Sequence, residues 1–60
     1  MCTPAMLGDT TTCKPADVWK QEASAACAQQ NLVLARFAAV STCNNMDYQK
    51  AMYVCCEPAP

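Results

Sequence analysis

The pattern of apolar and polar residues predicts one amphipathic helix near the middle of the chain. Within residues 16–30, Trp19, Ala23 and Cys27 recur at i, i+4 and i+8, and most polar residues fall elsewhere on the helical wheel. Asn31 suits the end of this helix, because asparagine tolerates the left-handed conformation of a C-terminal cap. The alanines on the apolar face allow a partner layer to approach closely around the bulky Trp19 ring.

The segments around the helix predict three strands, at residues 2–7, 32–40 and 51–56. Pro4 makes the first an edge strand, because proline cannot donate a hydrogen bond to a sheet. The second is β-prone without clean alternation, and Arg36 marks one of its faces as exposed. Turns are expected at residues 8–9 and 41–45, and a helix start at residues 14–17, with Pro15 in the first turn.

These elements predict an α+β fold, with one helix packed on a small three-stranded antiparallel sheet. The chain has no repeat, linker or low-complexity run, so we expect a single domain over residues 1–60, with a core at 2–56 and a tail at 57–60. The expected core residues are Trp19, Ala23, Leu34, Tyr48, Tyr53 and Val54.

The six cysteines indicate how so short a chain is stabilised. A 60-residue domain buries only about 60 % of its unfolded surface and usually needs a further constraint. An even cysteine count in a small chain predicts three disulfides and an oxidising compartment, either extracellular or periplasmic. Zinc is not favoured, because the chain has no Cys-x2-Cys pair and no histidine.

The adjacent Cys55 and Cys56 have a geometric meaning on a strand. Successive side chains point to opposite faces, so one sulfur should face the helix and the other the far side. A disulfide between neighbours strains the backbone, so each should bond to a distant cysteine. Cys27, on the apolar face of the helix, is the natural partner of whichever faces inward.

Charge and residue types exclude several functions. Four Lys or Arg against five Asp or Glu leave a net charge of -1 without a basic run, so nucleic-acid binding is not expected. No apolar stretch approaches the ~20 residues of a membrane span, and the first residues lack signal-peptide features, so Met1 is interpreted as an expression start on a trimmed precursor. Without histidine, Ser24 and Ser41 lack the usual base, and the carboxylates form no paired motif, so an enzyme is not expected.

The complete cysteine pattern resembles the copper-binding domain of the amyloid precursor protein family. The intervals between cysteines are 11, 14, 16, 12 and 1, and the pattern adds a closing Tyr-Val-Cys-Cys and the residues Trp19, Ala23 and Tyr48. The resemblance covers Cys2 to Cys56 and implies a helix on a three-stranded sheet in a secreted or membrane-anchored ectodomain. It also implies disulfides between Cys2 and Cys56, Cys13 and Cys43, and Cys27 and Cys55.

The copper ligands of that family are replaced in this chain. The resemblance places Ala16 and Lys20 at the family's two histidines, Phe37 at its tyrosine and Ala39 at its nearby methionine. Copper(II) prefers imidazole nitrogen or oxygen donors, which these residues do not offer at neutral pH. A copper(I) site from the four methionines is not favoured, because they show no ligand spacing and methionine commonly fills core gaps. No metal site or cofactor is therefore expected.

These observations favour a structural or protein-interaction module whose partner is another protein or a neighbouring domain of the parent chain. Two alternatives remain open: copper binding or reduction, as in the resembled family, and a small secreted effector or inhibitor on the same scaffold. An exposed apolar patch around Phe37, Val40 and Tyr53 would favour an interaction role.

Overall fold

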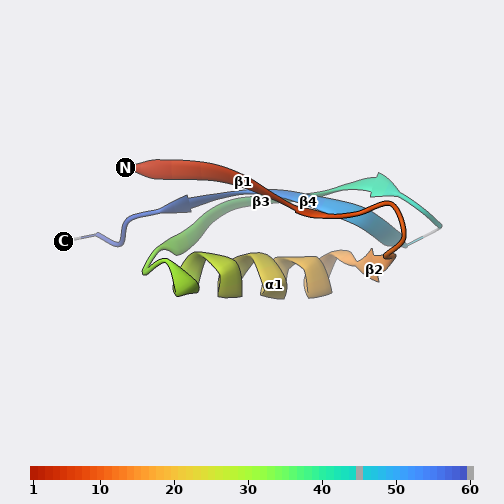
Figure 1. Ribbon diagram of the computed structural model, residues 1–60, viewed down its shortest axis with the longest axis horizontal. Helices are drawn as coiled ribbons and strands as arrows, with labels where there is room; N and C mark the ends of the chain where they lie inside the picture. Colours follow the sequence, from red (N-terminus) through yellow and green to blue (C-terminus); the bar gives the residue numbers. More distant parts are fainter. Residues whose placement is uncertain (45, 60) are drawn as a thin grey trace.

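The computed structural model describes residues 1–44 and 46–59. The elements, in chain order, are β1 (Cys2–Gly8), β2 (Lys14–Pro15), α1 (Ala16–Gln29), β3 (Val33–Thr42) and β4 (Asp47–Cys56). All the strands belong to one antiparallel sheet, and α1 lies along one face of it (Figure 1). The predicted α+β class is confirmed.

Strand β4 is the centre of the sheet. It pairs with β3 along one edge, and β1 and β2 share its other edge, β1 opposite residues 50–56 and β2 opposite residues 47–48. The register shifts between Leu34 and Arg36, which leaves Ala35 as a bulge in β3. The bulge places Leu34 opposite the buried Cys55 and Arg36 opposite Val54.

The prediction of three strands is wrong by one, because Lys14 and Pro15 form a short fourth strand. They pair with Tyr48 and Asp47 of β4. Pro15 has an extended conformation, with φ -60° and ψ 157°, so the helix begins at Ala16 and does not include the proline. A two-residue strand at the sheet edge tolerates proline, since it needs few ladder donors there.

The helix ends as the sequence predicted. Asn31 has a φ of 61°, the left-handed conformation expected of a cap residue. The Leu32 N–H donates to the Cys27 carbonyl over 2.9 Å, and the Asn31 N–H donates to the Ala28 carbonyl over 3.0 Å. These bonds satisfy helix carbonyls and turn the chain directly into β3.

The sheet is longer than the sequence suggested on the side of the β3–β4 connection. Ser41 and Thr42 were expected in a turn but belong to β3, and β4 begins at Asp47, before the predicted residue 51. Thr42 pairs with Tyr48, so the β3–β4 ladder continues into residues whose composition had predicted a turn. Of the expected turn and tail, Asn45 and Pro60 lie outside the described residues.

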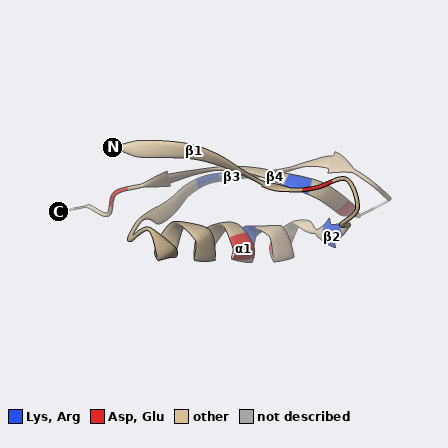
Figure 2. Ribbon diagram, viewed as in Figure 1, with Lys and Arg blue, Asp and Glu red and all other residues tan. Residues whose placement is uncertain are grey.

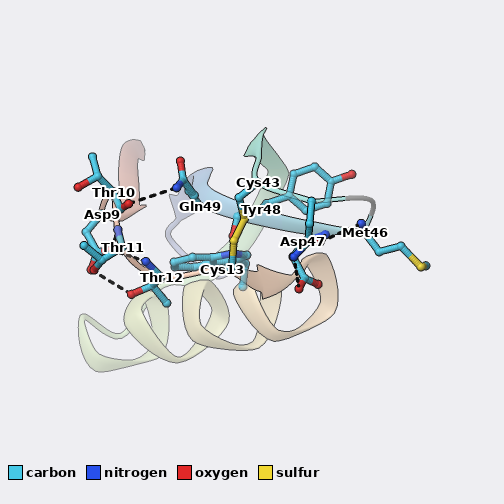
Figure 3. Close-up of a disulfide and its surroundings, with 12 residues drawn as sticks. Asp9, Thr10, Thr11, Thr12, Cys13, Cys43, Met46, Asp47, Tyr48 and Gln49 are labelled. Carbon is cyan, nitrogen blue, oxygen red and sulfur yellow. Dashed lines mark hydrogen bonds between the residues drawn. A yellow bond between two sulfur atoms is a disulfide. The ribbon is translucent and has the colours of Figure 1, made fainter.

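The core lies between α1 and the inner face of β4. Trp19, Ala23 and Cys27 of the helix are buried, as are Ala51, Tyr53 and Cys55, which alternate along β4. Leu34 and Phe37 are partly buried against this cluster. Val54 and Tyr48, expected in the core, are only half-buried on the alternate positions of β4, and the Tyr48 ring points away from α1 (Figure 3).

Candidate functional site at the helix and strand β3

The positions that the resemblance assigns to the family's copper ligands lie on two neighbouring elements. Ala16 and Lys20 are one turn apart on α1, while Phe37 and Ala39 are two residues apart on β3. Lys20 and Phe37 line the same open cavity of about 230 Å³, together with Leu34, Ala35 and Arg36. Ala16 and Ala39 are half-buried and do not line it. Helix packing on the sheet therefore brings together two of the four positions at one cavity.

The side chains at these positions do not fit copper(II). Alanine and phenylalanine offer no donor atom, and the ammonium of Lys20 has no free electron pair while it is protonated. Within residues 1–44 and 46–59, no group of three His, Cys, Asp or Glu side chains is placed to hold a metal ion.

Lys20 lines the cavity beside a partly apolar floor, whereas Arg36, opposite Val54 in the register, directs its side chain to the other face of the sheet. Lys20 and Arg36 are exposed, whereas Leu34 and Phe37 are half-buried. Among the described residues, no carboxylate lines the cavity. Neither cation forms an ion pair in the described part of the chain, where the ion pairs join Lys14 to Glu22 and the N-terminus to Glu57. Sequence reasoning treated Arg36 as a marker of an exposed face, which agrees with its exposure and with its place opposite Val54.

Lys14, unlike the other basic residues discussed, is held in place by contacts with its neighbours. Its ammonium lies 4.0 Å from the centre of the Trp19 ring and pairs with the Glu22 carboxylate. The Trp19 indole Nε1–H in turn donates to the Tyr48 carbonyl over 2.8 Å. These contacts tie β2, α1 and β4 together. The charge of Lys14 is already matched, unlike that of Lys20 or Arg36.

The disulfides lie where they join the layers and edges of the fold. The buried Cys27 and Cys55 connect α1 to β4, Cys2 and Cys56 connect β1 to β4 at directly opposed positions, and Cys13 is bonded to Cys43 (Figure 3). These are the pairs that the family resemblance implies. Cys55 faces the helix and Cys56 bonds along the sheet, as the alternation of a strand requires.

A polar loop organises the chain beside the Cys13–Cys43 disulfide. Asp9 Oδ1 accepts bonds from the backbone N–H groups of Thr11 and Thr12, each over 2.8 Å, and both threonine hydroxyls donate to the same carboxylate (Figure 3). The backbone N–H of Thr11, followed by the Thr11 and Thr12 hydroxyls, lowers the pKa of Asp9. Gln49 ties this loop to β4 by donating to the Thr10 carbonyl over 3.2 Å.

On the face of the sheet opposite α1, the apolar residues are more exposed than the sequence suggested. The suggested patch around Phe37, Val40 and Tyr53 does not form, because Tyr53 is buried and the other two are half-buried. Met6 and Met52 face each other across β1 and β4, with 59 % and 52 % of their surfaces exposed. Methionines therefore do not fill core gaps here. A second cavity, of about 310 Å³, lies on this side and is lined in part by Met52, Val54 and Arg36, the last directly opposite Val54.

The fold and its bridges define a small disulfide-stapled α+β domain. The match to a protein family is more specific: the family model described as copper-binding of amyloid precursor, CuBD, matches residues 1–57. The chain belongs to this family, which confirms the resemblance in the cysteine pattern. No curated protein matches the chain in sequence. Among the described residues, no helix has both the length and the hydropathy of a transmembrane segment.

Proposed function

We propose that this chain is a non-catalytic extracellular module with a structural or protein-interaction role, and that it has lost the copper site of its family. The observation that carries the proposal is the cavity at the family's ligand positions, where Lys20 and Phe37 stand in place of donors. The positive charge of Lys20 opposes the entry of Cu²⁺, since like charges repel strongly near a partly apolar surface.

Three disulfides support the assignment to an oxidising, extracellular environment, because such bridges persist mainly in secreted proteins and ectodomains. With all six cysteines oxidised, no thiolate remains as a nucleophile or soft metal ligand. The absence of histidine from the sequence also supports a non-catalytic role, because histidine is the commonest general base.

Copper titration tests the loss of the site. Isothermal calorimetry of the oxidised protein with Cu(II) at neutral pH should show no one-to-one complex at micromolar protein. The matched positive control is the triple variant Ala16→His, Lys20→His, Phe37→Tyr, which restores two imidazoles one helical turn apart and a phenol on β3. This variant should bind one copper ion while its circular dichroism spectrum stays unchanged.

Both outcomes are decisive. A stoichiometric copper complex with the unchanged protein contradicts the proposed loss of the site and favours copper binding as in the family. If the triple variant keeps its fold yet binds no copper, the correspondence between these positions and the family's ligands is wrong.

A further inference from the structure

We infer that the face of the sheet opposite α1 binds an acidic amphipathic helix of a partner protein. This surface, called the outer face below, has at its centre Pro4, Met6, Arg36, Met52 and Val54. The inference rests on the proposed interaction role and names the class of partner. It combines an uncovered apolar surface with two cations on the same side of the sheet.

The strand register arranges the outer face in two neighbouring rows across β1, β4 and β3. The residues of these positions alternate with the residues of β4 that are buried against α1, so their side chains point away from the helix. The rows consist of Pro4–Val54–Arg36 and Met6–Met52–Ala38. All but Met6 line the cavity of about 310 Å³, which therefore lies over both rows.

The sequences of β3 and β4 are those of strands covered on both faces. Residues 51–56 of β4 are all apolar, and residues 37–40 of β3 read Phe-Ala-Ala-Val. A strand with one face in water alternates apolar and polar residues, whereas a strand covered on both faces has an unbroken apolar run. Among the described elements, α1 alone covers the sheet, and it lies on the inner face (Figure 1). The outer face therefore has the composition of a covered surface and no cover within the described chain.

Methionine and arginine on the outer face suit a helical partner. The methionine side chain is unbranched and adapts its shape, and methionine-rich surfaces accept the apolar stripe of amphipathic helices. Both residue types are enriched in protein interfaces. Three strands about 4.8 Å apart present a surface roughly 10 Å wide, which matches the diameter of an α-helix with its side chains. The inner face of the same sheet already packs against a helix, α1.

The charges of the outer face select an acidic helix. Arg36 and Lys50 occupy outward positions of β3 and β4, and the outward positions of the described strands hold no Asp or Glu (Figure 2). Neither cation forms an ion pair within the described part of the chain. Arg36 lies opposite Val54, four residues from Lys50, so the two positions are about 13 Å apart along the strands. Carboxylates eight residues apart on a helix are separated by roughly 12 Å and match this spacing.

A second copy of this chain and an anionic membrane are poorer occupants of the outer face. Two outer faces packed together would bring Arg36 and Lys50 of each copy into one interface without a carboxylate at the outward positions, and like charges repel at short range. The chain has a net charge of -1, so it has no overall attraction for an anionic lipid surface. A helix of another protein supplies both apolar area and carboxylates at defined positions.

The test uses a blocked sixteen-residue helical peptide with a leucine stripe and, beside the stripe, two glutamates eight positions apart. One control peptide has glutamine in place of both glutamates, and the other has the same composition with its leucines scattered around the helix. ¹³C-methyl methionine spectra of the disulfide-bonded protein are recorded as each peptide is added. The glutamate peptide should shift Met6 and Met52. Met46 should stay unchanged, because it is 79 % exposed but lies between β3 and β4, outside the strands.

Matched substitutions locate the site on one face of the sheet. Arg36→Gln should weaken binding of the glutamate peptide about two- to fivefold, the range typical of exposed ion pairs. Lys20→Gln makes the same change of charge on α1 and should leave the affinity unchanged. Met52→Gln should weaken binding about three- to tenfold, because apolar contact area is lost. Met46→Gln changes an exposed methionine outside the strands and should have no effect.

Several results would overturn the inference. These are an absence of methyl shifts at millimolar glutamate peptide, equal binding of either control peptide, and an equal loss of affinity with Lys20→Gln. Vesicles of phosphatidylserine and phosphatidylcholine that shift Met6 and Met52 when the peptide does not would assign the outer face to a membrane. A dimer in sedimentation experiments that Met52→Gln dissociates would assign it to a second copy.

Copper titration of the same sample separates this inference from the proposed function. A one-to-one Cu(II) complex contradicts the proposed loss of the copper site whatever the peptide does. A protein that binds neither copper nor the glutamate peptide refutes the acidic-helix site and leaves the loss of copper and a structural role intact.

Discussion

The Cys27–Cys55 disulfide should stabilise the fold more than Cys13–Cys43, although the two bridges close loops of nearly equal length. Their sequence separations are 28 and 30 residues, so the chain-entropy contribution is about 3.6 kcal/mol for both. That contribution therefore cancels in a comparison of the two. The difference lies in burial: Cys27 and Cys55 are 0 % and 3 % exposed, whereas Cys13 is exposed and Cys43 half-buried.

Replacing each pair by alanine converts this difference into a measurable free energy. The buried pair leaves a cavity between α1 and β4, and two lost sulfur atoms should cost about 1–2 kcal/mol beyond the loop term. For a domain of this size, that corresponds to a Tm about 5–15 °C lower for Cys27→Ala/Cys55→Ala than for Cys13→Ala/Cys43→Ala. The Cys2–Cys56 bridge spans 54 residues and has the largest entropic contribution, about 4.2 kcal/mol, but its Cys2 is exposed.

Circular dichroism melts of the three double variants measure the order. The melts include TMAO, which strengthens burial and gives weakly stable variants a folded baseline. We expect the Cys27/Cys55 variant to be the least stable of the three. If the Cys2/Cys56 variant is the least stable instead, loop length governs and burial of the sulfur atoms contributes little. Equal midpoints for the Cys13/Cys43 and Cys27/Cys55 variants would refute the burial argument directly.

Three further predictions concern single residues. Trp19→Phe removes the donor to the Tyr48 carbonyl and should cost about 1–3 kcal/mol, seen as a lower urea midpoint; an unchanged midpoint contradicts the role of that bond. Folding lowers the pKa of Asp9 below 3.8, so the ionised carboxylate contributes its full stabilisation above pH 3.8. That stabilisation is lost as the pH falls through the pKa of the folded state. An NMR titration midpoint at or above 3.8 contradicts this prediction. Gly8→Ala places a Cβ against the Gln49 carbonyl oxygen at a φ of 124° and should cost at least about 1–3 kcal/mol; an equal Tm would show that the strand end relaxes freely.

The parts of the fold that follow from local signals were predictable from the sequence. The helix has a regular apolar face at Trp19, Ala23 and Cys27, and Asn31 marks its end by a conformation that few residues tolerate. The opposite directions of Cys55 and Cys56 follow from strand alternation alone. Each of these features depends on residues within a few positions of one another.

Features that depend on distant pairing could not be predicted in the same way. Strand β2 exists because Lys14 and Pro15 meet residues 47–48, more than thirty positions away, and its two residues carry no strand pattern of their own. The bulge at Ala35 likewise depends on the register with β4. Packing of α1 on β3 brings Lys20 and Phe37 to one cavity, and no spacing in the sequence indicates that contact.

The location of the cavity explains how its chemistry can change while the fold persists. Lys20 and Arg36 are exposed and lie outside the buried cluster and the disulfides, so replacing either should change stability by no more than about 0.5 kcal/mol. Phe37 retains an aromatic ring packed against that cluster, so the core contact does not require a phenol oxygen. Trp19 and Cys27 lack this freedom, because each is buried and joined to another element. A domain held in this way tolerates changes at Lys20 without repacking its core, so altered copper binding in a variant at this position will report on the cavity and not on unfolding.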